Sequence, residues 1–214
     1  MRKTVLFDLD GTLTDSGEGI INCATLALNY FHLPIPDIEQ MRTFVGPPLH
    51  DTFYKFGVPA DKLDLAVEVY RSRYNTVGKF ENHPYDGVYN LLENLRNDGY
   101  RLLVATSKPE ELSIEIMTKF DLVNFFDRIC GASIDRSRNT KAEVIAYLLE
   151  KEGSADDMIM VGDTAFDVIG ANAHNIPCIG VTWGYGTVES MQKANAAAIA
   201  NNMEQLYELI KNIK

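Results

Sequence analysis

The chain has 214 residues, and its 20 lysines and arginines against 30 aspartates and glutamates give a formal net charge of −10 at neutral pH. Hydrophobic residues make up 46% of the chain, which excludes a disordered protein because that much apolar surface offsets the entropy lost on folding. An acidic chain repels polyanions, so nucleic acid and anionic membrane surfaces are not expected as partners. The length fits one large domain or two unequal ones.

The cysteines and the N-terminal residues indicate a cytoplasmic protein. Cys23, Cys130 and Cys178 are far apart and odd in number, which predicts three buried thiols in a reducing compartment. The apolar run 4–7 is broken at once by two aspartates, so no signal peptide is expected. The sequence contains no run of about 18 apolar residues, so no membrane span is expected either.

Short apolar runs alternate with helical patterns along most of the chain. The expected strands are 4–7, 101–106, 128–130, 158–161 and 177–182. The expected helices are 88–97, 109–119, 140–151, 165–174 and 203–213. Strands that alternate with helices form parallel βαβ units, so we predict an α/β fold with a doubly wound, mostly parallel, Rossmann-like sheet.

Residues 17–81 follow a different pattern. Helical patterns punctuated by prolines occur there at 19–31, 49–56 and 60–77, without a convincing strand. An insert of about 65 residues is too long for an ordinary βα loop. We therefore predict a core domain made of 1–16 and 82–214, and an all-helical cap domain at 17–81.

The strongest chemical signal is the segment Asp8-Leu9-Asp10-Gly11-Thr12. Asp8 closes a strand, and ligands bind at the carboxyl ends of strands in doubly wound sheets. If the extended geometry continues, Asp8 and Asp10 point to one side, where two carboxylates repel each other unless a cation or a shared proton intervenes. A loop with turn-favouring aspartates is the alternative. A calcium loop of the EF-hand type would need further ligands at fixed spacing, which are missing.

A second acidic pair, Asp163 and Asp167, follows the strand 158–161. The spacing of four places both on one helix face if the helix has begun, and an acidic helix start that favours the dipole is the alternative. Ligands that offer only carboxylate oxygen suit a hard cation such as Mg²⁺ better than zinc. Two acidic sites at strand ends therefore predict a magnesium site.

Two further features could bind an anion. Thr106 and Ser107 end a strand, and Pro109 is expected to open a helix, whose free N–H groups and neighbouring hydroxyls can hold a phosphate. A plain helix cap is the alternative. Lys141 opens the helix 140–151, where its charge opposes the dipole, so we expect a nearby anion or carboxylate. A solvated surface lysine is the alternative, and Lys141 taken alone favours it.

These four features, in this order, resemble the haloacid dehalogenase (HAD) superfamily of phosphotransferases. The family pattern is Asp-x-Asp-Gly-Thr, a strand-end Ser or Thr, a Lys, and Gly-Asp-x-x-x-Asp. The resemblance covers nearly the whole chain, and the helical insert is similar to the cap of its phosphoglycolate-phosphatase-like branch. The acid at Asp10 favours phosphoryl transfer over dehalogenation, because a carbon–halogen substrate has no leaving oxygen to protonate.

The resemblance implies a role for each site residue. Asp8 would be the nucleophile that forms an aspartyl-phosphate, and Asp10 the general acid and base. Thr106, with the backbone at Ser107, would bind phosphate oxygens together with Lys141. The Mg²⁺ ligands would be Asp8, Asp163 and the Asp10 backbone carbonyl, with Asp167 as their support.

The cap loop 42–49 is similar to the loop that faces the active site in that branch. Arg42 and Gly46 are the candidate specificity residues, although Arg42 also fits an ordinary surface arginine. Pro47-Pro48 departs from the more glycine-rich form typical of phosphoglycolate phosphatases. We therefore expect a small phosphorylated metabolite as substrate: phosphoglycolate, a 5′-nucleotide, pyrophosphate or a sugar phosphate. The alternatives are a β-phosphoglucomutase type of transfer and a phospho-accepting receiver module without turnover.

Overall fold

The computed structural model describes residues 3–135 and 137–213 and divides the chain into two compact units. The first comprises Met1–Thr14 and Pro84–Lys214, and the second comprises Asp15–His83. The predicted cap limits, 17 and 81, lie two residues inside the ends of the second unit. Within the described residues, no helix combines the length and the apolar character that a bilayer crossing requires.

The first unit contains a six-stranded sheet in the order β5-β4-β1-β6-β7-β8. Its strands are β1 (Thr4–Phe7), β4 (Arg101–Pro109), β5 (Arg128–Ala132), β6 (Met158–Gly162), β7 (Cys178–Val181) and β8 (Ala198–Ala200). Every neighbouring pair is parallel. This arrangement confirms the predicted α/β fold and adds β8, whose three residues are too few to show a sequence pattern.

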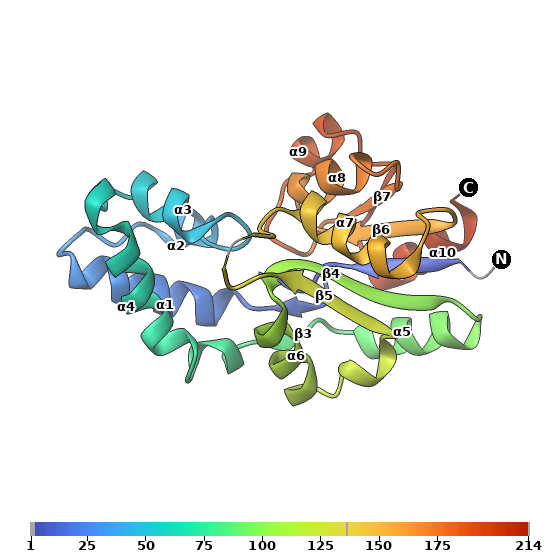
Figure 1. Cartoon of the computed structure of the whole chain (residues 1–214), viewed down its shortest axis with the longest axis horizontal. Coiled ribbons are helices and arrows are strands. Elements are labelled where there is room, and N and C mark those ends of the chain that lie inside the picture. The colour runs from blue at the N-terminus through green and yellow to red at the C-terminus, as the bar shows by residue number, and fades with distance from the viewer. Residues whose placement is uncertain (1–2, 136, 214) are drawn as a thin grey trace. The chain divides into compact units, whose positions relative to one another are not determined.

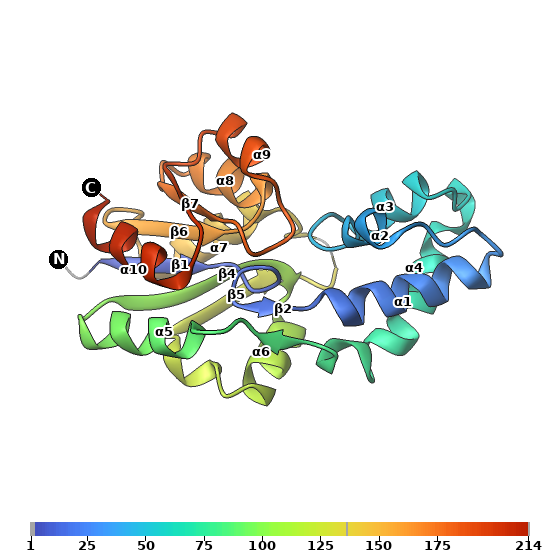
Figure 2. The same ribbon diagram turned by 180° about the vertical axis from the view of Figure 1, so that it is seen from behind.

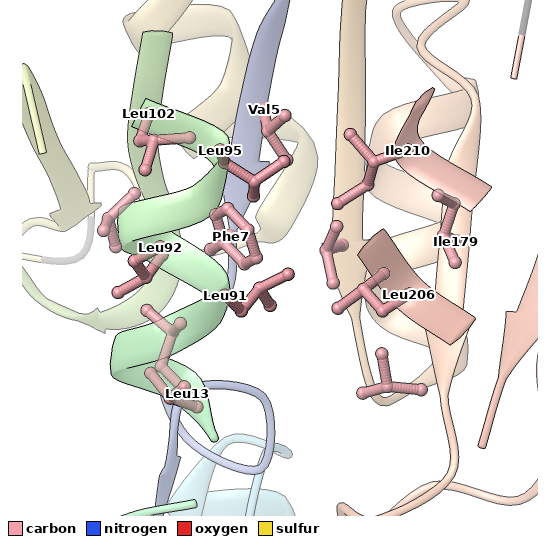
Figure 3. Packing of buried hydrophobic residues seen from close by; sticks show 14 of the residues in the cluster. Val5, Phe7, Leu13, Leu91, Leu92, Leu95, Leu102, Ile179, Leu206 and Ile210 are labelled. Atoms are coloured by element: carbon pink, nitrogen blue, oxygen red, sulfur yellow. The ribbon is translucent and has the colours of Figure 1, made fainter. Parts of the chain in front are cut away.

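Helices cover both faces of this sheet (Figures 1 and 2). One face carries α5 (Val88–Asn97), α6 (Glu110–Lys119) and α10 (Met203–Asn212), and η3 (Val123–Phe125) lies beside α6. The other face carries α7 (Lys141–Glu152), α8 (Ala165–Asn172) and α9 (Val188–Lys193). Figure 3 shows the first of these two cores, in which leucines of α5 lie against Val5 and Phe7 of β1.

The connection between β4 and α6 differs from the prediction. The strand does not end at Thr106 and Ser107 but continues to Pro109, with a shift of its register to β5 between Ala105 and Pro109. Pro109 has an extended ψ of 132°, so it precedes α6 instead of forming its first turn. The predicted end of the strand at Thr106 is therefore three residues too early, and α6 begins at Glu110, one residue after the predicted start at Pro109.

Local capping explains where α7 and α8 begin. Thr140 and Glu143 form a reciprocal capping box at the start of α7, and Thr164 and Asp167 form another at the start of α8. In each box a side chain satisfies a backbone N–H that has no partner within the helix. The second box matters for function, since it holds a predicted site residue in a defined orientation.

The second unit is helical. It contains α1 (Gly17–Tyr30), α2 (Ile38–Arg42), α3 (Leu49–Lys55), η1 (Ala60–Lys62), α4 (Leu63–Tyr74) and η2 (Gly78–Phe80). A short sheet pairs β2 (Thr14–Asp15) with β3 (His83–Pro84) at the two chain crossings between the units. Inside the unit, Phe44 packs against Phe53 and Phe56 with ring centroids 5.2 and 5.0 Å apart. The three cysteines of the chain are free and buried, as predicted.

Candidate active site

The order of the strands brings polar residues that follow separate strands to one edge of the sheet. β1 lies between β4 and β6, with Phe7 paired to Val104 on one side and to Val161 on the other. Parallel strands end at the same edge, where ligands bind in doubly wound folds. Asp8 follows β1, and Asp163 follows β6. The residues named from separate stretches of sequence are thus neighbours in space.

Lys141, the first residue of α7, is the cation at the centre of this site. Its Nζ lies 2.8 Å from Asp8 Oδ1 and 2.8 Å from Asp167 Oδ1. It also donates to the backbone carbonyl of Ala105 at 2.8 Å, and its side chain is only 3% exposed. Three acceptors match the three protons of an ammonium group. The two carboxylates explain why a lysine occupies a helix start where the dipole opposes it.

The carboxyl groups of the site are buried close to one another. Burial raises the pKa of Asp8 to about 7, because Lys141 only partly offsets the effects of burial and of the Asp167 charge. Burial, with the charges of Asp167 and Asp8, also raises the pKa of Asp163 well above its usual range. Burial alone would lower the pKa of Lys141, but Asp167 and Asp8 raise it above its ordinary value. The site therefore holds more negative charge than its lysine compensates.

A loop after β7 holds Asp163 in place. Asp163 Oδ1 accepts a hydrogen bond from the Thr12 hydroxyl at 3.2 Å, and Oδ2 accepts one from the Tyr185 amide at 2.8 Å. A methyl group on Gly11 or Gly184 would clash with Asp163 Oδ2. Gly11 also has a φ of +81°, which side chains rarely adopt, so glycine is required there for two reasons.

The donor set fits a hard divalent cation. One carboxylate oxygen from each of Asp8, Asp163 and Asp167 lies within 4.8 Å of the others, and all three donors are oxygens. Asp167 already uses Oδ2 for the amide and hydroxyl of Thr164, at 3.0 and 2.9 Å, and Oδ1 for Lys141. Asp8 and Asp163 are consequently the two carboxylates best placed to hold a metal. Added positive charge would also favour their ionised forms.

The Asp10 carboxylate lies outside this group of three. Its Oδ2 is 2.7 Å from Nζ of Lys108, and the two side chains are only 15% and 7% exposed. Its other oxygen, Oδ1, is buried and has no hydrogen-bond partner in the described part of the chain. Asp10 is therefore held by a lysine of its own, separately from the cluster around Lys141.

The remaining predicted site residues have different surroundings. A hydrogen bond from Thr106 acts on the Asp8 carboxyl, and the half-buried Ser107 follows Thr106 in β4. Arg42 and Gly46 are exposed residues of the helical unit. Their role in specificity stays a prediction, as does the role of Ser107 in phosphate binding.

Sequence reasoning missed three features of the site: Lys108, the Thr12 hydroxyl and the loop at Tyr185. Lys108 stands two residues after Thr106, a spacing that places both on one side of a strand, so the continuing strand would have revealed it. Tyr185 lies between two glycines shortly after a strand. A glycine-rich loop at that edge of the sheet is a signal for close backbone approach to a site.

A doubly wound sheet with buried carboxylates and a lysine at its carboxyl edge is typical of proteins that act on phosphate groups. Comparison with protein families makes this class specific. Residues 5–181 match the model of the haloacid dehalogenase-like hydrolases, and the chain belongs to this family. The resemblance inferred from the four sequence features is thereby confirmed.

Relatives with known names cover almost the whole chain. A tyrosine-protein kinase, PtkA, of Mycobacterium tuberculosis is 38% identical over 97% of this chain and 72% of its own length. A 5′-nucleotidase of Pseudomonas aeruginosa is 36% identical over 97% of this chain and 95% of its own. A phosphoglycolate phosphatase of Vibrio parahaemolyticus is 26% identical over 97% of this chain and 96% of its own length.

A solved structure shares the fold end to end. The crystal structure of a predicted phosphatase from Clostridium acetobutylicum is 41% identical and superposes with a TM-score of 0.94 over 100% of both chains. Family, relatives and fold together identify this chain as an enzyme of the HAD phosphatase type, a hydrolase of phosphate esters.

Proposed function

We propose that the chain hydrolyses a small-molecule phosphomonoester through an aspartyl-phosphate on Asp8, with Mg²⁺ as its cofactor. The observation that carries the proposal is the position of Asp8 at the end of the central strand, 2.8 Å from the buried Lys141 and beside Asp163. A carboxylate is an uncommon nucleophile and needs its charge balanced by neighbours. The positive charge of Lys141, next to Asp8 Oδ1, supplies part of that balance.

In the first step an oxygen of Asp8 attacks the phosphorus atom, and the bond from phosphorus to the ester oxygen breaks. Asp8 Oδ1 already accepts hydrogen bonds from Lys141 and from the amide of Leu9, the latter at 2.7 Å, so Oδ2 is the attacking atom. Asp10 donates its proton to the departing oxygen as the alcohol leaves. The product is an aspartyl-phosphate and a free alcohol.

In the second step a water molecule attacks the phosphorus atom of the aspartyl-phosphate. Asp10, now ionised, takes a proton from that water, the bond to Asp8 breaks, and inorganic phosphate leaves. Thr106 and the backbone at Ser107 bind phosphate oxygens throughout, and the positive charge of Lys141 balances the charges of Asp8 and the phosphate. Most of the catalytic effect in phosphoryl transfer comes from such positioning and charge neutralisation.

The metal completes the charge balance. Asp8, Asp163 and the backbone carbonyl of Asp10 would hold Mg²⁺, and Asp167 would fix the arrangement through Thr164 and Lys141. When bound, the ion supplies positive charge that offsets the carboxylates and the phosphate. The raised pKa values of Asp8 and Asp163 support this assignment, because a neighbouring cation restores their ionised forms.

The helical unit is proposed as the cap of the active site, with Arg42 and Gly46 contacting the substrate. A cap excludes bulk water and selects the alcohol part of the ester. Among substrates, 5′-nucleotides deserve the first test, because the relative named 5′-nucleotidase is more similar to this chain than the one named phosphoglycolate phosphatase.

The test is a phosphate-release panel with purified protein and Mg²⁺. It compares 5′-nucleotides, phosphoglycolate, pyrophosphate, sugar phosphates and p-nitrophenyl phosphate, each with and without chelator. We expect many turnovers per enzyme and no turnover in chelator. Phosphate release by Asp8→Asn should fall to background. The rate of phosphate release by Asp10→Asn from an alkyl phosphate should be lower by about 10²–10⁴-fold. Asp156→Asn, at an exposed residue that contacts Ser154, is the matched control and should retain full activity.

The opposite outcomes would exclude the proposal. Undiminished rates in chelator would exclude a metal requirement. Sustained turnover by Asp8→Asn would exclude Asp8 as the nucleophile. A single turnover without phosphate release would favour a phospho-accepting module. Isomerisation of a sugar 1-phosphate without phosphate release would favour a mutase.

A second candidate function is transfer of a phosphoryl group to a protein tyrosine. It is favoured by the 38% identity to the protein named tyrosine-protein kinase. An aspartyl-phosphate can in principle be attacked by a phenol as well as by water. Incubation with ATP labelled at the γ-phosphate and a tyrosine-containing protein separates the two, because hydrolysis labels inorganic phosphate whereas transfer labels the protein.

A further inference from the structure

The segment that carries Lys108 is an irregular part of the sheet. The pairing of β4 with β5 shifts between Ala105 and Pro109, and the amide of Lys108 donates to the Thr106 hydroxyl at 3.2 Å. Such bulges occur next to active sites, where they redirect a side chain. The bulge places Lys108 so that its ammonium group meets Asp10, a residue far away in the sequence.

Neighbouring elements fix the backbone around Lys108. A methyl group on Gly131 of β5 would clash with the carbonyl oxygen of Lys108 and with the backbone of Glu110. At the start of α6, the Ser113 hydroxyl donates to the carbonyl of Pro109 at 3.0 Å. Glycine is therefore required at 131 so that β5 can approach this segment closely. The position of the ammonium group does not depend on a flexible loop.

The contact of Lys108 with Asp10 is short and buried, and it engages only one of the two carboxylate oxygens. Nζ lies 2.7 Å from Oδ2, whereas the buried Oδ1 has no hydrogen-bond partner among the described residues. An unpaired buried oxygen costs free energy, so its retention points to a function. The bridge of Asp10 to Thr14 and the hydrogen bond from the Gly11 amide to the Thr14 carbonyl, at 2.8 Å, hold the backbone of this turn.

We propose that Lys108 is a positioning residue that anchors Asp10 through Oδ2 and so reserves Oδ1 for proton transfer. The inference rests on the proposed function and deepens it. In the first step the proton passes from Asp10 Oδ1 to the ester oxygen while the phosphorus–oxygen bond breaks. In the second step Oδ1 takes a proton from the attacking water. A carboxyl that is free to rotate would spend much of its time in unproductive orientations.

Leaving groups of different basicity test this role. An alkoxide needs a proton to depart, whereas p-nitrophenolate departs without one, so the positioning of Asp10 affects alkyl phosphates selectively. We expect Lys108→Met to lower kcat/KM on an alkyl phosphate by about 10–100-fold. The loss on p-nitrophenyl phosphate should be about tenfold smaller, since kcat/KM reports the first step alone. Lys193→Met, which removes a surface lysine 2.6 Å from Glu189, is the control and should change neither value.

A double-mutant cycle with Asp10→Asn separates positioning from a structural effect. If Lys108 acts only through Asp10, Lys108→Met should cause no further loss in the Asp10→Asn background. Near-UV circular dichroism and the unfolding temperature verify the fold of each variant. Should Lys108→Met fail to fold, Lys108→Gln replaces it in the same cycle.

Each contrary result overturns the inference in a distinct way. Equal losses on both substrates would mean that Lys108 contacts the phosphoryl group or only supports the fold. Additive losses in the cycle would mean that it acts independently of Asp10. An active wild type with normal Lys108→Met activity would reject the inference and leave the proposed function intact. A wild type that releases no phosphate from any ester would reject both.

Discussion

In the α/β unit, three carboxylates and a lysine lie together at the carboxyl edge of a sheet, whereas in the helical unit one arginine forms a bidentate ion pair with one glutamate. Arg73 makes two parallel bonds of 2.6 Å to Glu81, and the Asn22 amide adds a third contact at 3.2 Å. The hydrogen bonds from Arg73 lower the pKa of Glu81. In contrast, burial raises the pKa values of Asp8 and Asp163.

The opposite directions of these pKa shifts reveal what each group of charges does. A lowered carboxyl pKa means that the folded state favours the ion, so the Arg73–Glu81 pair stabilises the helical unit. A raised carboxyl pKa means that the folded state disfavours the ion, so the acidic group at the sheet edge costs stability without further positive charge. Buried carboxyl groups that keep a raised pKa at the expense of stability are typical of active sites.

The largest effect should follow from Lys141→Met. Removing the ammonium group leaves Asp8 and Asp167 buried without their cation, which we expect to lower the free energy of unfolding by about 3–5 kcal/mol. Phosphate release should fall to background as well. Urea denaturation of the metal-free protein measures the first effect. The exposed Lys193–Glu189 pair offers a control, since Lys193→Met should cost only about 0.3–0.5 kcal/mol. Unchanged stability of Lys141→Met would show that other groups compensate these carboxylates.

A smaller effect is expected from the pair in the helical unit. The side chains of Arg73 and Glu81 are 29% and 22% exposed, so solvent weakens their attraction. Arg73→Met should lower the free energy of unfolding by about 1–3 kcal/mol, because it leaves Glu81 with fewer partners. The double variant Arg73→Met/Glu81→Met should recover most of that loss, since no half-buried charge remains. If the double variant is as unstable as the single one, the aliphatic part of Arg73 contributes more than its charge.

The smallest effect concerns pH. The folded-state pKa of Glu81 lies below its unfolded value, so its ionised form stabilises the fold above the unfolded pKa of about 4.3. That contribution is lost as the pH falls through the folded pKa. The stability difference between wild type and Glu81→Gln should therefore be about 1 kcal/mol at neutral pH and should shrink in acid. A difference that stays constant from neutral pH to pH 3 would contradict the lowered pKa.

The alternation of apolar runs with helical patterns was enough to predict the α/β fold, because period and turn chemistry are local properties. The same pattern marked Asp8 and Asp163 as strand-end acids, since each directly follows its strand. It failed at Pro109, where a proline typical of a helix start instead extends a strand. The competing force there is the pairing of β4 with β5, which local preference does not contain.

What the sequence alone determined is the inventory of the site: the acids after the strands, the lysine at a helix start and the glycine that permits the turn at Gly11. Only the tertiary structure decided how these charges are paired. Lys141 joins Asp8 to Asp167, whereas Lys108 holds Asp10, and no local pattern predicts which carboxylate each lysine contacts. The reason is physical: pairing depends on the order of strands, a bulge and a close approach of β5, all of which arise from contacts between distant segments.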